Sequence, residues 1–248
     1  MSENYDFAKL RSELINLTKS QLSKTVSTDI ILIQTLSSID ELTISLNTLS
    51  KRLREWYGYI LPELEHKIKD HEKFSELIMN KSYDELIKEF APNGTMGKKL
   101  SDEDLEIVVG FAKKLNELYS EKERLLNYLE KKLKEFMPNT HYLLGTTITA
   151  RILSSAGSLE KLTRVPASTI QLFGAEKALF RHLKSGARSP KYGHIFGHQL
   201  LQQASNDMKG KVARSLADKT SICVKLDFFK GDFLADTYLK GLQKRFSR

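Results

Sequence analysis

Two long stretches of the sequence repeat apolar residues at alternating spacings of three and four, which places a narrow apolar stripe along an α-helix. The first stretch starts from a predicted helix cap at Asp29 and carries Leu32, Ile39, Leu42, Leu46, Leu49, Leu53, Trp56 and Ile60. The second carries Val108, Phe111, Leu115, Leu118, Leu125, Leu129, Leu133 and Phe136, with Lys122 at one stripe position. Each stripe needs another helix to cover it, so this pattern constrains the fold more than any other feature.

The segment between the stripes predicts short helices and turns. It contains two helix-start boxes, Ser82-x-x-Glu85 and Ser101-x-x-Asp104. Residues 91–100, APNGTMGKKL, read as a turn because of their Pro, Asn and Gly content. Pro62 falls inside the first helical pattern, where proline removes a backbone donor, so we predict a kink or break at residues 58–62.

The simplest arrangement is a long antiparallel coiled-coil hairpin with small helices or turns at its tip. A helix of 30 residues extends about 45 Å, so such a hairpin would project from a domain and seek a partner, often a second copy. The alternative is that both helices face the core of a compact bundle. The leucines predicted to bind the partner are Leu42, Leu46, Leu49, Leu53, Leu115, Leu118 and Leu129.

The rest of the chain predicts a globular helical domain. We expect one buried helix over 143–157 (LLGTTITARILSSAG), a short helix stopped by Pro166, and further helices at 175–184, 195–204, 208–226 and the C-terminus. Strand patterns are absent from the sequence, so the predicted fold class is all-α. The predicted domains are an N-terminal segment at 1–28, frayed or forming a leading helix, the coiled-coil hairpin at 29–137 and the globular domain at 138–248.

The charge is divided unevenly between these parts. Residues 1–137 carry 21 Lys and Arg against 24 Asp and Glu, whereas residues 138–248 carry 18 against 7, a net of +11. A basic domain joined to a near-neutral one favours a polyanionic partner for the basic part. From charge alone, a membrane surface and an acidic protein stay open.

The densest positive charge lies in residues 174–196, GAEKALFRHLKSGARSPKYGHIF. Gly174 precedes a predicted helix start, where backbone N–H groups favour an anion. Lys177, Arg181 and Lys184 share one face of that helix, and Arg188 and Lys191 continue into a loop. A second basic helix offers Lys209, Lys211, Arg214 and Lys219. Arginine can bind phosphate with two parallel hydrogen bonds, so we predict phosphate contacts here, with Phe180 and Phe196 in the core.

Catalytic and metal sites find no support in the sequence. The run GTMGKK (94–99) lacks the spacing of a phosphate-binding loop, and His194 and His198 lack a third metal ligand. Cys223 is predicted to be a small core residue, and as the single cysteine it fits a reducing compartment. No apolar run approaches the ~20 residues that cross a bilayer, and no signal peptide begins the sequence. We therefore expect a soluble intracellular protein that is not an enzyme and needs no cofactor.

Several motifs resemble the Nop family. REWYGYILPEL (54–64) is similar to the signature that ends the first coiled helix in that family. The stretch AGSLEKLTRVPASTIQLFGAEKALFRHLK (156–184), followed by SPKYGHIF, resembles the centre of the Nop domain, and KGKVARSLADKTSICVKLDFF resembles its next basic helix. The resemblance covers about residues 29–230. The family contains core proteins of box C/D ribonucleoproteins, which guide RNA 2′-O-methylation, and a spliceosomal relative.

The resemblance implies an RNA-binding scaffold that recognises a kink-turn RNA already held by a ribosomal-protein-like binder, and that dimerises through its coiled coil. The RNA contacts that it implies are Gly174, Ala175, Lys177, Arg181, Lys184, Arg188, Lys191 and His194. Lys211 and Arg214, chosen from the basic residues alone, complete the predicted RNA-binding set. Glu176, a solvated carboxylate on residue grounds, would orient a neighbouring lysine or face the partner protein.

Family members that assemble guide particles carry an N-terminal domain that docks the methyltransferase fibrillarin, and here only about 28 residues precede the coiled region. The chain is thus expected to be a fragment or a short form that does not itself recruit fibrillarin. The short basic end suggests an archaeal source. The location would be cytoplasmic in an archaeon and nucleolar in a eukaryote. The alternatives are a spliceosomal relative that binds a small nuclear RNA, and a coiled-coil adaptor without RNA.

Overall fold

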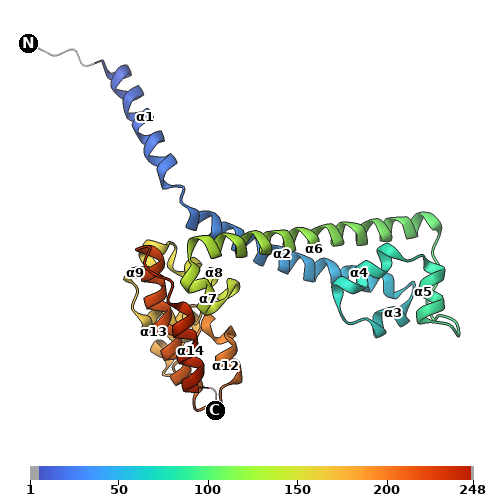
Figure 1. Cartoon of the computed structure of the whole chain (residues 1–248). Helices are drawn as coiled ribbons and strands as arrows, with labels where there is room; N and C mark the ends of the chain where they lie inside the picture. Colours follow the sequence, from blue (N-terminus) through green and yellow to red (C-terminus); the bar gives the residue numbers. More distant parts are fainter. Residues whose placement is uncertain (1–5, 247–248) are drawn as a thin grey trace, which may run out of the picture. The chain divides into compact units, whose positions relative to one another are not determined.

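The structure, a computed structural model, describes residues 6–246, with the side chains of residues 23–25 excepted. Within this range the regular elements are fourteen α-helices and one 3₁₀ helix, and no strand is present (Figure 1). The predicted all-α class is confirmed. Among the described residues, no helix combines the length and the apolar character needed to span a membrane.

The chain divides into two compact units. One comprises Ser37–Tyr128, and the other comprises everything from Leu129 onward together with the part of the chain up to Leu36. The boundaries fall inside the two long helices, α2 (Thr28–Gly58) and α6 (Asp102–Phe136), rather than at the predicted domain limits of 28/29 and 137/138. Because each long helix continues from one unit into the other, a helix end is a poor guide to a boundary here.

In the unit 37–128, α2 and α6 run antiparallel. The Trp56 ring lies 6.3 Å from the Phe111 ring, and the Ser50 hydroxyl lies 2.9 Å from the Tyr119 hydroxyl. Residues later in α2 therefore meet residues earlier in α6, as Figure 1 shows for these segments. Both helices contribute to one apolar core that includes Leu46, Leu53, Val108, Ala112 and Leu115.

Four of the seven leucines predicted to bind a partner are buried within the single chain. Leu46, Leu53, Leu115 and Leu129 are at most 1% exposed within the single chain, so they pack inside it. Leu46, Leu53 and Leu115 belong to the apolar core of the unit 37–128, whereas Leu129 lies in the other unit. Leu42, Leu49 and Leu118 are only half-buried and keep part of their surface free.

The predicted break after α2 is confirmed, and three short helices follow it. These are α3 (Pro62–Lys67), α4 (His71–Asn80) and α5 (Tyr83–Phe90). Arg54 holds the end of α3 in place, because its Nη2 donates to the carbonyls of Glu65 and Ile68, both at 2.7 Å. The Arg54 guanidinium also lies 4.6 Å from the centre of the Phe74 ring.

The loop after α5 is pinned by Glu63. The Glu63 carboxylate accepts hydrogen bonds from the Thr95 hydroxyl at 2.8 Å and from the Met96 N–H at 2.9 Å. These bonds, the Met96 N–H foremost, lower the pKa of Glu63. Gly97 lies so close to the chain that a Cβ there would be 2.2 Å from the Ile60 carbonyl oxygen. The basic run at 94–99 is thus an ordered turn, as predicted.

The second unit is a helical globule built around α13. Its elements are α7 (Pro138–Leu144), α8 (Thr146–Ala156), α9 (Leu159–Arg164), α10 (Ala167–Leu172), α11 (Glu176–Ser185), η1 (His194–Gly197), α12 (Gln199–Gln203), α13 (Lys209–Phe228) and α14 (Ala235–Phe246). Helix α13 packs against α7, α9, α10 and α14, which places Val212, Leu216 and Val224 in the core. The N-terminal segment forms α1 (Phe7–Thr25), capped by Asp6.

Two predicted helices are each divided in two. The helix predicted at 195–204 forms η1 and α12, with His198 in an extended conformation between them. The prediction of a single helix over 143–157 is wrong because Gly145 adopts φ +77° between α7 and α8. Residues with a side chain rarely take that conformation, and glycine takes it without strain. The turn redirects the chain, so that α7 and α8 pack against each other.

Candidate nucleic-acid interface

Helix α11 is a cationic helix without a buried residue. Lys177, Arg181 and Lys184 are exposed along it and lie on one face. None of these three side chains forms an ion pair within residues 6–246. The acids that neutralise many other cations of this chain are therefore not used here, and the positive charge is available to an external anion.

The start of α11 is organised around Gly174. This glycine adopts φ +87°, and its N–H donates to the Glu176 carboxylate at 2.8 Å. Burial opposes ionisation of Glu176, but the Gly174 N–H and further contacts outweigh it and lower the pKa of this carboxyl. Glu176 was predicted to orient a lysine or to face a partner protein. In the structure its carboxylate closes the turn that precedes Lys177.

His194 lies against the same turn. A Cβ at Gly174 would be 2.4 Å from the His194 ring, so only glycine leaves room for the imidazole. The His194 N–H donates to the Phe173 carbonyl at 2.6 Å, and the Gly193 N–H donates to the Gln171 carbonyl at 2.9 Å. These bonds bring His194, twenty residues away in sequence from Gly174, to the beginning of the cationic helix.

A cavity of about 420 Å³ unites the loop after α11 with α13. Lys191, from the loop, lines it together with Lys211 and Arg214 of α13. The loop is held by the Gln171 side chain, whose Nε2 donates to the Lys191 carbonyl at 2.6 Å. The lining also contains Ser189, Pro190, Gly210 and one acid, Asp207. Two basic segments that the sequence offered separately thus meet at one concave surface, which suits a phosphate group.

The aromatic side chains of residues 174–196 are exposed or half-buried rather than in the core. Tyr192 and Phe196 stack with their ring centres 4.8 Å apart, and the Lys209 ammonium lies 5.5 Å from the Phe196 ring. The prediction that Phe180 and Phe196 are buried is wrong, because they are 68% and 37% exposed. Within residues 6–246, no helix covers the side of α11 that carries Phe180, and a pattern along one helix does not reveal this.

Other predicted positions take structural roles. The Lys219 ammonium lies 4.7 Å from the Tyr238 ring, so this lysine braces α13 against α14. Arg188 lies exposed in the loop, and Ala175 immediately precedes α11. The RNA contacts of these two residues stay a prediction.

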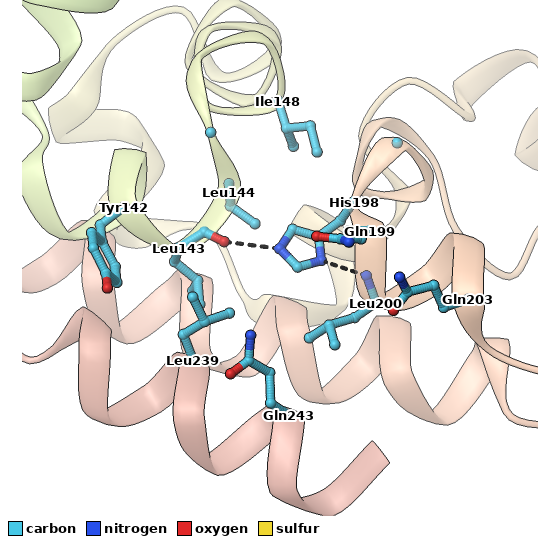
Figure 2. Close-up of a pocket in the computed structure, with 12 residues that line it drawn as sticks. Tyr142, Leu143, Leu144, Ile148, His198, Gln199, Leu200, Gln203, Leu239 and Gln243 are labelled. Carbon is cyan, nitrogen blue, oxygen red and sulfur yellow. Dashed lines mark hydrogen bonds between the residues drawn. The ribbon is translucent and has the colours of Figure 1, made fainter. Parts of the chain in front are cut away.

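His194 and His198, which were considered above as metal ligands, lie in different surroundings. His198 turns inward, where its Nε2–H donates to the Leu143 carbonyl at 3.0 Å and its Nδ1 accepts from the Leu200 N–H at 3.2 Å (Figure 2). Burial lowers the pKa of His198. Within the described part of the chain, no group of three His, Cys, Asp or Glu residues is arranged to hold a metal ion.

Comparisons with known proteins show which proteins this chain is similar to. Residues 38–248 match the family described as "Nop: snoRNA binding domain, fibrillarin". The chain is 42% identical over 233 residues to an uncharacterized NOP5 family protein of Methanocaldococcus jannaschii, covering 88% of this chain and 56% of that protein. It is 36% identical over 218 residues to nucleolar protein 58 of Lodderomyces elongisporus, covering 81% and 42% of the two chains.

A further relative is nucleolar protein 56 of Schizosaccharomyces pombe. It is 35% identical over 222 residues, and the match covers 81% of this chain and 45% of that protein. The chain thus spans about half the length of the curated relatives it matches. Among solved structures, a chain of a fibrillarin/Nop5p complex is similar with a TM-score of 0.59 and 24% identity, over 97% of this chain and 78% of that one. At that identity the likeness establishes the fold alone.

Proposed function

The chain belongs to the Nop family, and we propose that it is a non-catalytic RNA-binding scaffold of a box C/D guide ribonucleoprotein. The observation that carries the proposal is the set of cations on α11, its loop and α13 that form no ion pair within residues 6–246. Lys177, Arg181 and Lys184 face solvent along one helix, and Lys191, Lys211 and Arg214 surround one cavity. Methyl transfer would belong to the methyltransferase fibrillarin.

We further propose that α11 reads a composite surface of kink-turn RNA and a ribosomal-protein-like binder. Phe180 and Leu183 are 68% and 71% exposed, and they alternate along the helix with Arg181 and Lys184. Exposed aromatic and aliphatic groups are typical of protein contacts, whereas unpaired cations are typical of phosphate contacts. One short helix with both kinds of surface supports simultaneous contact with RNA and protein.

The test is a gel shift of the full chain with kink-turn RNA, with and without its primary binder. We expect Arg181→Ala and Lys184→Glu to weaken the ternary complex, and to reduce the slope of log affinity against log salt by about one per lost phosphate contact. Lys113→Glu is the matched control, because Lys113 is an exposed lysine of α6 in the other unit. Equal weak binding to any RNA, whether or not the primary binder is present, would refute the composite surface.

We propose that the hairpin contributes a dimer contact through the part of its stripe that the chain leaves open. Leu42, Leu49 and Leu118 are half-buried, and Ile44 is 67% exposed on the same helix as the first two. Sedimentation equilibrium tests this proposal. We expect Ile44→Glu to shift the chain towards the monomer, whereas Ser45→Glu, at the neighbouring exposed position, does not. A wild-type chain that stays monomeric at high concentration would contradict the proposal.

The proposed assembly also assigns a location. As part of a guide particle, the chain would be nucleolar in a eukaryote and cytoplasmic in an archaeon. The naming of its relatives as nucleolar proteins 58 and 56 supports the first case, and the archaeal NOP5 relative supports the second. Fluorescence microscopy of the tagged chain in its own cells tests this assignment, and a location on membranes would contradict it.

A further inference from the structure

A second cavity in the globular unit has a character quite unlike that of the cationic one. It encloses about 440 Å³ between the α7–α8 turn, α12 and α14 (Figure 2). This volume lies in the range of about 300–1,000 Å³ typical of small-molecule pockets. Its described lining contains no Lys, Arg, Asp or Glu. A phosphate, a carboxylate or an ammonium ion would therefore find no opposite charge in it.

Three glutamine amides surround this cavity. Gln199 and Gln203 come from successive turns of α12, and Gln243 comes from α14. Across the described residues, none of the three side chains makes a hydrogen bond. Each amide offers two donors and an acceptor, so the rim can bind a ligand that displays both kinds of group along one edge.

The floor between these amides is apolar and fixed. Ile148, Leu200 and Leu239 line it, and the His198 ring lies among them (Figure 2). The hydrogen bonds from His198 to Leu143 and from Leu200 to His198 occupy both ring nitrogens. The imidazole is thus held as a neutral tautomer and presents its ring face, rather than a polar edge, to the cavity.

We propose that this pocket binds one unpaired nucleobase of a single-stranded RNA segment. A nucleobase is flat and apolar on its faces, and its edge carries neutral donors and acceptors, which matches an apolar floor with an amide rim. RNA-binding proteins recognise splayed-out bases in this way, by stacking and by hydrogen bonds to base edges. An extended peptide, by contrast, pairs its backbone with a strand edge, and the described residues contain no strand.

The inference rests on the proposed RNA-binding function and adds a second contact to it. The pocket belongs to the same unit as the cationic cavity, and only the 3₁₀ helix η1 separates the loop of Lys191 from His198. An RNA strand whose phosphates are held beside Lys191 could therefore deliver a base to the Gln199–Gln203 rim. The cationic cavity would supply affinity, and the amide-rimmed pocket would select the base.

Methyl NMR of the full chain tests the proposal, because Ile148, Leu200 and Leu239 carry methyl groups in the floor. The probes are adenosine, ribose 5-phosphate, a capped trialanine peptide, an RNA hexamer of adenines (the adenine hexamer) and a hexamer with an abasic site at every position (the abasic hexamer). We expect the adenine hexamer to shift these methyl signals at lower concentration than adenosine, and the abasic hexamer and ribose 5-phosphate, which carry no base, to leave them unchanged.

Variants of the rim provide the control. Gln203→Leu combined with Gln243→Leu keeps the side-chain volume and removes two amides, and we expect it to weaken adenine-hexamer binding by at least about tenfold. Gln21→Leu, at an exposed position of α1, should have no effect.

Three outcomes would overturn the inference: shifts by the peptide but not by adenosine, tighter binding of free adenosine than of the hexamer, or equal binding by the Gln203→Leu, Gln243→Leu variant. The kink-turn assay separates its failure from that of the proposed function. If only the pocket assignment fails, assembly with kink-turn RNA still depends on Arg181.

Discussion

Thr140 donates two hydrogen bonds to the carboxylate of Asp227, from its N–H at 2.9 Å and from its hydroxyl at 2.6 Å. The neighbouring Asn139 donates its own N–H to the same carboxylate at 2.9 Å. The Asn139 amide oxygen in turn accepts from the N–H groups of Leu234 and Ala235, at 2.8 and 3.1 Å. A single buried acid near the end of α13 therefore accepts the hydrogen bonds of the backbone N–H groups that begin α7. It also holds Asn139, which accepts those at the beginning of α14.

Removing that acid should loosen the globular unit. We expect Asp227→Ala to lower the free energy of unfolding of this unit by about 3 kcal/mol, because several buried donors lose their acceptor at once. Native-state hydrogen exchange of the α7 and α14 amides measures the effect without requiring the two units to unfold together. Asp218→Ala, at an exposed position of the same helix, is the control and should change exchange little. Similar protection in both variants would contradict the proposed role of Asp227.

The sequence predicted the helices of this fold well, since their patterns are local. The stripes, the break after Gly58 and the box at Ser82 all appear at the expected places, because spacing and capping are properties of neighbouring residues. Asp227 was not predicted to matter, because an aspartate in a charged helix ordinarily faces water. Its partners lie nearly ninety residues earlier in the chain, at Asn139 and Thr140.

The sequence predicted which residues make up the candidate RNA-binding site, but it did not predict how they are arranged in space. The basic residues could be selected from sequence, yet the meeting of Lys191 with Lys211 at one cavity depends on tertiary packing. The exposure of Phe180 was not predictable either, since the apolar face of a helix is buried only if another element covers it. The amide-rimmed pocket could not be predicted from the sequence, because glutamines on short helices are common and have no distinctive spacing.

Glycine at position 174 is predicted to be required for RNA-complex assembly. A methyl group there would strain a backbone at φ +87° and displace the His194 ring. Gly186 is the matched control, because it also has a positive φ, of +66°, but nothing lies within 4 Å of a Cβ at that position. Both alanine variants should lose about 1 kcal/mol through the backbone. In gel shifts with kink-turn RNA and its primary binder, only Gly174→Ala should assemble poorly; equal losses would show that His194 packing is not involved.

The thiol of Cys223 is predicted to be inert in the folded chain. Burial, with a contribution from the Asp227 charge, raises the pKa of Cys223 to about 12. At about pH 8 the reactive thiolate is then roughly a thousandfold scarcer than in an ordinary exposed cysteine. We expect iodoacetamide to label the native protein very slowly and the denatured protein at once, with mass spectrometry as the readout. Rapid labelling of the native chain would mean that α13 opens locally.

Stability of the globular unit should decrease as the pH falls below the ordinary histidine range. Burial lowers the pKa of His198 from 6.5, so the unfolded chain binds a proton that the folded chain excludes. Stability from this group is complete above about pH 6.5, and it is lost between that value and the lower pKa of the folded state. Protonation of Nδ1 would in addition break the hydrogen bond that this atom accepts from the Leu200 N–H.

Urea unfolding followed by circular dichroism at about pH 8 and about pH 5.5 measures this effect. His198→Gln should unfold more easily at the higher pH but lose less stability on acidification than the wild type. Burial, together with the Lys134 charge, also lowers the pKa of His141, so part of the pH dependence should remain in this variant and disappear only when His141 is replaced as well. An unchanged pH dependence in His198→Gln would show that the His198 ring does not hold α12 to the α7–α8 turn.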